Sequence, residues 1–474
     1  MYSSHASPAC PAYCLTIKHT QPLPMFRFFS SCICCVVLWL PLRTVAQQDS
    51  VPADGHMSLE QCIRYALNNQ PALKQSLIDA SIQQANINIS LSAWLPQATF
   101  NASLQHYFEL PTNVITNFSN PAAGKIAVQS GVFNTSTPQF NATETFFSND
   151  VLYAANTAKF YRRQAEQNIT STRIDLVVDV SKAFYDVLLT QEQISILNGD
   201  IARLEKNLKD AYSQYQAGIV DKVDYKRATI ALSNAKTQLK TATENLQAKY
   251  VYLQQLMGYR QQGLFSLDFD TTRMMQEVVA DTNTTLQYDN RIEYQRLVTN
   301  KKLQGQATKY YQYGFLPSLS GFYTYNAVFQ NDKFADLYSK QYPNSLVGLN
   351  LSLPLFQGFK RIQNIRKSKL QEERLDLDMV DLTLRINSEY SAAMAGYKSN
   401  LTDLHATEEN RQIAKEVYDV VKLQYREGIK NYLEVITAET DLRTAELNYL
   451  NALFRVLSGK LDLERAMGNI SVNY

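Results

Sequence analysis

Two carboxylates stand at matching places in the 474-residue chain, because Asp224 and Glu434 each follow a glycine, Gly218 or Gly428, by six residues. Carboxylates that crowd together attract cations and have raised pKa values. The sequence places no nucleophile–base pair, phosphate-binding loop or metal-binding cluster beside them, so enzymatic chemistry is unsupported. In the simplest alternative, both acids are solvated and lie in the first turn of a helix, where the helix dipole favours a negative charge.

Histidine and cysteine offer no other chemical site. His56, His106 and His405 are far apart and lack metal-ligand spacing. All cysteines except Cys62 lie within the first 46 residues, so export with loss of that segment would leave no intramolecular disulfide. The sequence therefore predicts no metal and no cofactor, and Cys62 is expected to be a small buried residue on a helix.

The composition excludes further classes of protein. With 45% apolar and 19% charged residues, the chain can bury a sizeable core. Its formal net charge of +2 gives no electrostatic footprint for nucleic acid. Tyrosine is the outlier, with 29 Tyr and 21 Phe against 2 Trp.

The first 46 residues predict export. Met25-Phe26-Arg27 begins an apolar run over residues 28–42, which ends just before Thr44-Val45-Ala46. A charged start, a short apolar run and a small-x-small site are typical of a signal peptide. A membrane-spanning helix needs roughly 20 apolar residues, which is more than this run contains. We expect the mature chain to begin near Gln47 and residues 1–24 to be an extension upstream of the true start.

The rest of the chain is predicted to contain two tandem repeats. Motifs in the first part of the chain recur later at two fixed offsets, and each aligned stretch needs no gap. At an offset of 221 residues, Asn69 matches Asn290 and Trp94-Leu95-Pro96 matches Phe315-Leu316-Pro317; at 210 residues, Tyr215–Ile219 matches Tyr425–Ile429 and Leu256-Met257-Gly258 matches Ala466-Met467-Gly468. We expect repeat 1 to span residues 57–265 and repeat 2 residues 286–470.

Each repeat is expected to contain a pair of long helices. Proline, which costs ~3 kcal/mol inside a helix, is missing from residues 139–316 and after residue 354. Apolar residues step by three and four, as in Leu232, Ala235 and Leu239, a spacing typical of coiled-coil packing. These patterns predict helix pairs at about 154–257 and 360–467, which would span roughly 90 to 100 Å.

Between the helices the period changes to two, which predicts one strand hairpin in each repeat, at about 95–152 and 316–356. From Val347 to Leu355, apolar residues alternate with small or polar ones. The candidate strand at 139–148 is the weakest, because Glu144 falls in its apolar register. Residues 111–138 and 330–345 are expected to be loops.

These strands predict an oligomer. Strands of about ten residues that are rich in Tyr and Phe and apolar on one face are typical of a transmembrane β-barrel. A sheet exposed to lipid cannot leave its edges unpaired. Four strands are too few to close a barrel, so two chains would supply eight strands, three chains twelve and four chains sixteen.

From Met57 to Met467, the chain resembles the TolC-like outer-membrane efflux proteins. The resemblance is carried by the opening segment 57–71, the two strand starts Leu95-Pro96 and Leu316-Pro317, the strand end Pro354–Gly358 and the turns at Gly218 and Gly428. It implies an α+β membrane protein, a homotrimer in which a long α-helical coiled-coil barrel in the periplasm continues into a transmembrane β-barrel shared by three chains. It also implies a passive exit duct of a tripartite efflux or type I secretion system, opened by a periplasmic adaptor and an inner-membrane pump.

The resemblance implies roles for individual residues as well. The turns Ala217-Gly218-Ile219 and Glu427-Gly428-Ile429 correspond to the tips that dock the adaptor. Four residues correspond to the constriction, or gate, at the closed entrance: Asp224, Tyr425, Lys430 and Glu434. Lys430 replaces a common arginine and is the poorer bidentate partner, and three Glu434 carboxylates would surround one axis. From their alternation, four aromatic residues are expected to form a belt at the lipid interface: Tyr323, Tyr325, Phe329 and Phe356.

Two other functions remain open from the sequence. The first is a periplasmic or secreted coiled-coil scaffold without channel activity, and the second is an independent porin, which would need many more strands in one chain. The apolar face from Val347 to Leu355 discriminates the scaffold from the duct. In a soluble hairpin this face would need cover from helices whose apolar stripes are already used on each other.

Overall fold

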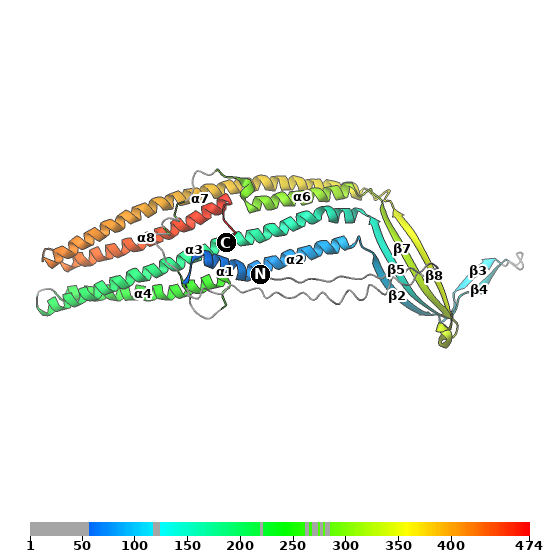
Figure 1. Ribbon diagram of the computed structural model, residues 1–474, viewed down its shortest axis with the longest axis horizontal. Helices are drawn as coiled ribbons and strands as arrows, with labels where there is room; N and C mark the ends of the chain where they lie inside the picture. The colour runs from blue at the N-terminus through cyan, green and yellow to red at the C-terminus, as the bar shows by residue number, and fades with distance from the viewer. Residues whose placement is uncertain are drawn as a thin grey trace, which may run out of the picture. The chain divides into compact units, whose positions relative to one another are not determined.

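The computed structural model describes residues 56–116, 124–218, 221–260, 265–267, 274, 278–279 and 285–474. The predicted signal peptide and Ile219 lie outside the described residues. In chain order the elements are β1 His56–Met57, α1 Leu59–Asn69, α2 Pro71–Ser92, β2 Gln97–His106, β3 Thr112–Thr116, β4 Lys125–Gln129, β5 Asn134–Phe147, α3 Asn149–Gln216, α4 Lys222–Met257, β6 Ser266–Leu267, η2 Tyr288–Asn290, α6 Ile292–Gln312, β7 Ser318–Asn331, η3 Phe334–Ser339, β8 Gln341–Ser352, α7 Lys360–Arg426 and α8 Tyr432–Met467 (Figure 1).

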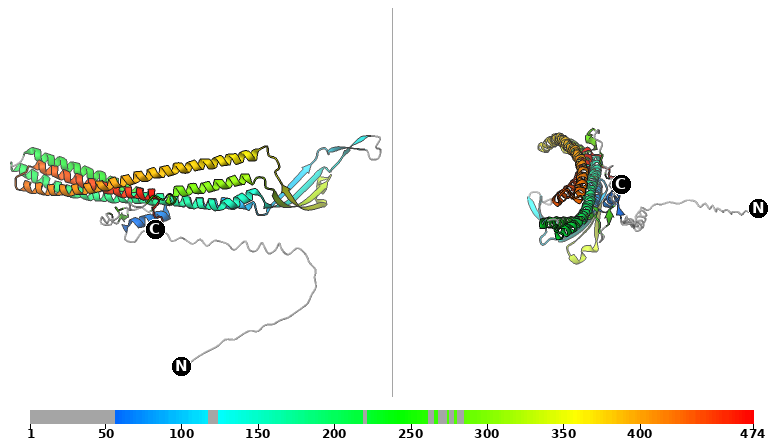
Figure 2. Two further views of the ribbon diagram at one scale, coloured as in Figure 1. Left: turned by 90° about the horizontal axis from the view of Figure 1, so that it is seen from above. Right: turned by 90° about the vertical axis from the view of Figure 1, so that its left-hand side faces the viewer.

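The long helices form two antiparallel hairpins, α3 with α4 and α7 with α8, which lie side by side (Figures 1 and 2). Helices α3 and α7 have 68 and 67 residues, and α4 and α8 have 36 each. The turns of both hairpins lie at the end opposite the strands (Figure 1). Helices α4 and α8 begin and end at the offset of 210 residues, so the same hairpin is built twice.

The junction after each shorter helix is also built twice. Gly258 and Gly468 end α4 and α8 with φ of 67° and 75°, a left-handed conformation that favours glycine. A Cβ on Gly258 would lie 2.7 Å from the carbonyl oxygen of Asn69, and one on Gly468 would lie 2.7 Å from that of Asn290. Backbone conformation and backbone crowding therefore both require glycine here.

The strands form an antiparallel sheet in the order β2-β5-β7-β8. Strand β5 joins the two repeats, because it pairs with β2 on one side and with β7 on the other. It begins at Asn134, earlier than the predicted residue 139, and includes Pro138, where its ladder with β7 is interrupted. Proline has no N–H to donate, which is why the sequence pattern hid the first part of this strand.

The two segments predicted to be loops contain regular structure instead. In the first, β3 pairs with β4 in a separate hairpin, since Val114, Ile115, Ile126 and Val128 have side chains that favour strands. In the second, β7 runs on to Asn331 and η3 then leads into β8, which begins at Gln341.

The sheet has one apolar and one polar face, because paired residues point to the same side. The apolar face holds Ala98, Phe100, Ala102 and Leu104 of β2, Phe140 and Ala142 of β5, Leu319, Tyr323, Tyr325, Ala327 and Phe329 of β7, and Val347, Leu349 and Leu351 of β8. The other face is mainly polar and holds Gln97, Thr99, Asn101 and Ser103 of β2, Thr137, Gln139, Asn141 and Thr143 of β5, Ser318, Ser320, Thr324 and Asn326 of β7, and Asn344, Asn350 and Ser352 of β8, together with the apolar Phe322, Val328 and Leu346. Glu144 lies opposite Gly321 on the apolar face, in the register that the sequence predicted.

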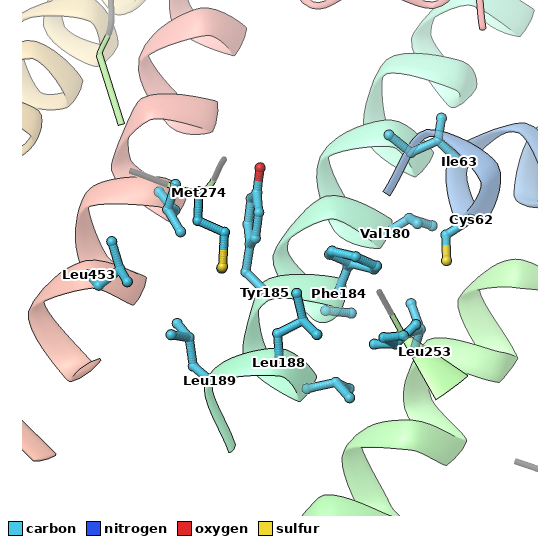
Figure 3. Packing of buried hydrophobic residues seen from close by; sticks show 14 of the residues in the cluster. Cys62, Ile63, Val180, Phe184, Tyr185, Leu188, Leu189, Leu253, Met274 and Leu453 are labelled. Atoms are coloured by element: carbon cyan, nitrogen blue, oxygen red, sulfur yellow. The ribbon is translucent and has the colours of Figure 1, made fainter. Parts of the chain in front are cut away.

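The largest buried core lies where α1, α3, α4 and α8 meet (Figure 3). Phe184 and Leu188 of α3 and Leu253 of α4 pack there with Cys62. Cys62 is fully buried, as predicted, and burial raises the pKa of its thiol to about 12. None of the described helices is both long and apolar enough to cross a membrane.

Candidate functional site at the helical hairpin turns

Each hairpin turn reverses the chain on a left-handed glycine. Gly218 and Gly428 have φ of 72° and 73°, and a Cβ on either would find no atom within 4 Å. The glycines are therefore required by the backbone conformation and not by crowding. The neighbouring Ala217, Glu427 and Ile429 are exposed, so every described residue of the two predicted docking tips is accessible.

The first turn of α8 brings two predicted gate residues together. Asn431 caps the helix, and its side chain accepts a hydrogen bond from the backbone N–H of Glu434 at 3.1 Å. The Nζ of Lys430 lies 2.5 Å from Oε2 of Glu434, and both side chains are partly exposed. In this conformation each Glu434 charge is matched by a lysine of the same chain.

Tyr425 connects the two hairpins close to their turns. Its hydroxyl donates to Oε1 of Gln214 on α3 at 2.8 Å. Burial raises the pKa of Tyr425, the bond to Gln214 lowers it, and the charges of Asp210 and Asp224 raise it further. Asp224 therefore acts on this tyrosine through its charge, from the first turn of α4.

A residue that sequence reasoning missed completes this contact. Tyr432 lies in a small cluster with Ala211, Ala228 and Val435, and its ring centroid is 5.8 Å from that of Tyr425. Burial raises the pKa of Tyr432, and its hydroxyl has no hydrogen-bond partner among the described residues. Neither Tyr432 nor Gln214 belongs to a motif, so only the packing of α3 against α7 and α8 identifies them.

The four residues of the predicted aromatic belt lie at different levels. Tyr323 and Tyr325 are on the middle of β7, whereas Phe329 pairs with Gln341 at the end far from the helices. Phe356 follows β8 on the helix side, and its ring packs on Phe359 with centroids 5.6 Å apart. Because a strand rises ~3.3 Å per residue, Tyr323 and Phe329 are roughly 20 Å apart along the strand. The alternation identified the face of these side chains but not their level.

The part of the chain that the structure describes contains no group of three or more His, Cys, Asp and Glu that could hold a metal ion. The turns thus combine two glycines of positive φ, the Lys430–Glu434 ion pair and the hydrogen bond from Tyr425 to Gln214. This arrangement can hold helices together or release them.

Comparisons with known proteins place this architecture. A family model described as outer membrane efflux protein matches residues 62–259 and 307–469. The outer membrane protein TolC of Vibrio cholerae is 21% identical over 336 residues, which cover 70% of this chain and 76% of the relative. The cobalt-zinc-cadmium resistance protein CzcC of Cupriavidus metallidurans is 23% identical over 325 residues, 66% of this chain and 72% of the relative.

A solved structure shares the fold. The crystal structure of the outer membrane protein VceC from Vibrio cholerae matches with a TM-score of 0.66 at 15% sequence identity. The match covers 86% of this chain and 96% of that one.

Proposed function

This chain belongs to the outer membrane efflux protein family, and from that premise we propose that it is the exit duct of a tripartite efflux or type I secretion system. It acts as a passive homotrimeric conduit in the outer membrane, with its helices in the periplasm and no chemistry of its own. A periplasmic adaptor and an inner-membrane pump open it.

The observation that carries this proposal is the four-stranded sheet, which has an exposed apolar face and two unpaired edges. Val347 and Leu349 are 81% and 73% exposed on that face. Among the strands of the described residues, β2 and β8 each have a partner on one side only. In lipid an unpaired backbone group costs several kcal/mol, so β8 of one copy should pair with β2 of the next until a ring closes.

The polar face of the sheet suits the inside of such a ring. Thr324 Oγ1 donates to Asn141 Oδ1 at 2.9 Å, and Asn326 Nδ2 donates to Asn344 Oδ1 at 2.8 Å. Side chains that bond across strands in this way form a hydrophilic wall, which is typical of a water-filled pore.

The outermost helices both carry exposed apolar side chains. On α2 these are Leu77, Ile78, Ile82 and Ile89, and on α7 they are Leu370, Leu377, Val380 and Leu384. Helices α2 and α4 lie on the side of the molecule that ends in strand β2. Helix α7 lies on the opposite side, which ends in strand β8. Contact of one edge with the other edge of the next copy would bury both sets. Three copies would supply twelve strands and twelve long-helix segments, as the resemblance implies.

The scaffold alternative is less consistent with these exposures. In a soluble hairpin, Val347, Leu349 and Leu351 would be covered, yet they are among the most exposed apolar residues. A porin would need more than the single four-stranded sheet that the described residues form.

Within the duct, we assign the two hairpin turns (217–219 and 427–429) to adaptor docking. Asp224, Tyr425, Lys430 and Glu434 hold the periplasmic entrance closed, and Tyr323, Tyr325, Phe329 and Phe356 contact the lipid at several depths. Repeats at 57–265 and 286–470, preceded by a cleaved segment at 1–46, complete the organisation.

The mass of the membrane form tests the proposal. The chain is expressed with its own first 46 residues in a Gram-negative host, and the detergent-extracted outer-membrane fraction is weighed by light scattering. A particle of three times the mature chain mass that conducts ions in planar bilayers is expected. A soluble periplasmic monomer or dimer would refute the duct and favour the scaffold.

A further inference from the structure

We propose that a cavity at the strand end of the helices binds organic cations, in which a positively charged centre carries aromatic or apolar groups. The cavity lies between α2, α3 and α6, and we call it the tyrosine hollow after its lining, which includes Asp150, Tyr153, Tyr161, Tyr310 and Tyr311. The inference rests on the proposed duct, because the duct brings cargo past this cavity.

The tyrosine hollow has the size of a small-molecule site. Its volume is about 650 Å³, and ligand pockets usually measure roughly 300–1,000 Å³. Ile87 of α2 and Val151 of α3, each only 4% exposed, supply apolar lining. A ligand of a few rings can therefore lie there with much of its surface removed from water.

Four half-buried tyrosines give the tyrosine hollow an aromatic wall. The ring centroids of Tyr153 and Tyr310 are 5.1 Å apart, and those of Tyr310 and Tyr311 are 5.3 Å apart. The ring planes meet at 51° and 67°, so the rings do not stack flat on one another. Because the face of an aromatic ring is electronegative, several rings at an angle around one space attract a cation.

A carboxylate supplies the charge that complements a cation. The hydroxyl of Tyr310 donates to Oδ1 of Asp150 at 2.6 Å, and Asp150 remains exposed. This hydrogen bond, ahead of burial, raises the pKa of Tyr310 to about 12, and burial is the main cause that raises the pKa of Tyr153 to about 12. Both tyrosines are therefore uncharged at neutral pH. Among the described residues that line the tyrosine hollow, only Asp150 carries a charge.

The tyrosine hollow opens on the concave side of the helical wall. Seen along the long axis, the described helices form an arch with α1 on its convex side (Figure 2). Helix α3 contacts both α2 and α6 and lies between them (Figure 1). A cavity lined by all three faces the inside of the arch, where α2 and α6 converge. In a closed ring of chains, the inside of the arch is the wall of the pore.

The heptad pattern of α3 indicates the same side. Phe184 packs with α1 (Figure 3), and Asn156 and Asn149 stand four and five heptads before it. These two asparagines line a separate, smaller cavity. At 3.5 residues per turn, Ala154 and Tyr161 of the tyrosine hollow lie about 150° around α3 from them. The tyrosine hollow therefore faces away from the side on which α1 lies.

The matching place in the other repeat has the opposite charge. By the repeat offsets, that place lies between α6, α7 and the α2 of the next copy. At the offset of 210 residues, Asp150, Tyr153, Thr157 and Tyr161 correspond to Lys360, Gln363, Lys367 and Gln371. Lysines and amides there replace the carboxylate and the rings, so an organic cation is repelled. The duct should therefore bind one organic cation per chain.

Titration of the purified protein tests the site. The probe is benzyltrimethylammonium, which joins an aromatic ring to a permanent positive charge. Isothermal titration into the detergent-extracted protein should give one site per chain. Benzenesulfonate, which has the same kind of ring with a negative charge, should not bind. Absence of binding by the cation, or equal Kd values for the two probes, would overturn the proposal.

Variants of the lining locate the bound probe. Asp150→Asn should raise the Kd about ten-fold, because it removes the charge that attracts the cation. Tyr161→Leu should raise the Kd several-fold, because one ring of the aromatic wall is lost. Tyr313→Leu is the matched control, since Tyr313 of α6 lines the smaller cavity and not the tyrosine hollow. Its Kd should stay within about two-fold of the parent value, because all rings of the wall remain. An unchanged Kd in both lining variants would overturn the proposal.

Cysteine variants test the side on which the site opens. In a Cys62→Ser background, Ala154→Cys lies in the tyrosine hollow and Asn156→Cys in the smaller cavity. A cationic thiol-specific reagent should lower the conductance of the trimer in planar bilayers only with Ala154→Cys, and saturating benzyltrimethylammonium should slow this loss. Equal loss in both variants, or no protection by the probe, would contradict a site inside the duct.

These outcomes separate the site from the proposed function. The tyrosine hollow belongs to a single chain, so the titration decides its binding in any assembly. A conducting trimer that does not bind the cation would overturn the site alone. A monomer mass by light scattering would refute the duct, and cation binding by that monomer through Asp150 would still confirm the site.

Discussion

The sheet and the helical hairpins place their apolar side chains in opposite ways. On the sheet the apolar side chains point outward, with Val347 and Leu349 exposed, and the polar side chains bond to one another on the other face. In the hairpins Leu453 and Val456 are buried, and even Asp200 and Glu439 are buried, with arginine partners that are partly exposed. A sheet that faces lipid needs no apolar cover, whereas helices in water do. The comparison indicates that the sheet of this chain is suited to lipid and its helical hairpins to water.

The largest expected effect comes from charging the lipid face of the sheet. Leu349→Arg should prevent assembly in the outer membrane, because arginine in the hydrocarbon region costs up to about 2–4 kcal/mol per copy. Asn350→Arg is the matched control, because Asn350 follows Leu349 in sequence but points to the opposite, polar face. Light scattering of the detergent extract measures the trimer. Equal loss in both variants would show that the outward face does not meet lipid.

Substitution of glycine by alanine should lower the stability of the fold more at the helix ends than in the sheet. At Gly258 and Gly468 a Cβ meets backbone at 2.7 Å under a positive φ, so each substitution should cost about 2 kcal/mol or more. At Gly321 and Gly348 a Cβ would be crowded by the movable side-chain rings of Phe146 and Phe322, at 2.8 and 2.6 Å. Turning such a ring off its rotamer costs about 0.5–1.5 kcal/mol. Thermal melts followed by circular dichroism give the order, and a reversed order would contradict it.

Charges at the hairpin turns should affect conductance without affecting assembly. Glu434→Ala with Asp224→Ala removes two predicted gate acids and frees Lys430. We expect a conductance several-fold above that of the parent in planar bilayers, because the links that hold the closed entrance are weakened. If the trimer assembles and its conductance is unchanged, neither residue belongs to the gate.

The smallest effect concerns the pH dependence of stability at the buried Glu439, which accepts hydrogen bonds from Arg203 and Asn207. Burial, and next the charge of Asp200, raise the pKa of Glu439 above its usual 4.5, against the opposing effects of Arg203 and Asn207. A raised pKa in the folded state means that the proton stabilises the fold. This stability is fully present below the unfolded pKa and is lost as pH rises through the folded pKa.

In the variant Glu439→Gln, the side chain at position 439 does not titrate. The difference in melting temperature between parent and variant should therefore grow as pH rises from 4.5 through the raised pKa, in favour of the variant. The other raised carboxyls, including Glu446 and Glu464, titrate in both proteins and cancel in the difference. A difference independent of pH would mean that Glu439 keeps its ordinary pKa.

The sequence predicted the family and the alternation of the sheet well, and both are confirmed. The regions that it missed have identifiable causes. Pro138 concealed the first part of β5, and the short β3–β4 pair was concealed in a segment rich in Asn, Thr and Ser. The four residues of the expected belt lie at different levels, because alternation fixes a face while only register fixes a height.

By itself the sequence determined what repeats along the chain: proline-free helices, period-two strands, the glycine turns and the two offsets. These features depend on residues close in sequence, where sterics and periodicity act locally. Only the tertiary structure decided which distant residues meet. Asp200 and Glu439, or Gln214 and Tyr425, share no motif, and they came together because α3 packs against the second hairpin. Buried charge is satisfied by partners in space, and a linear pattern does not record them.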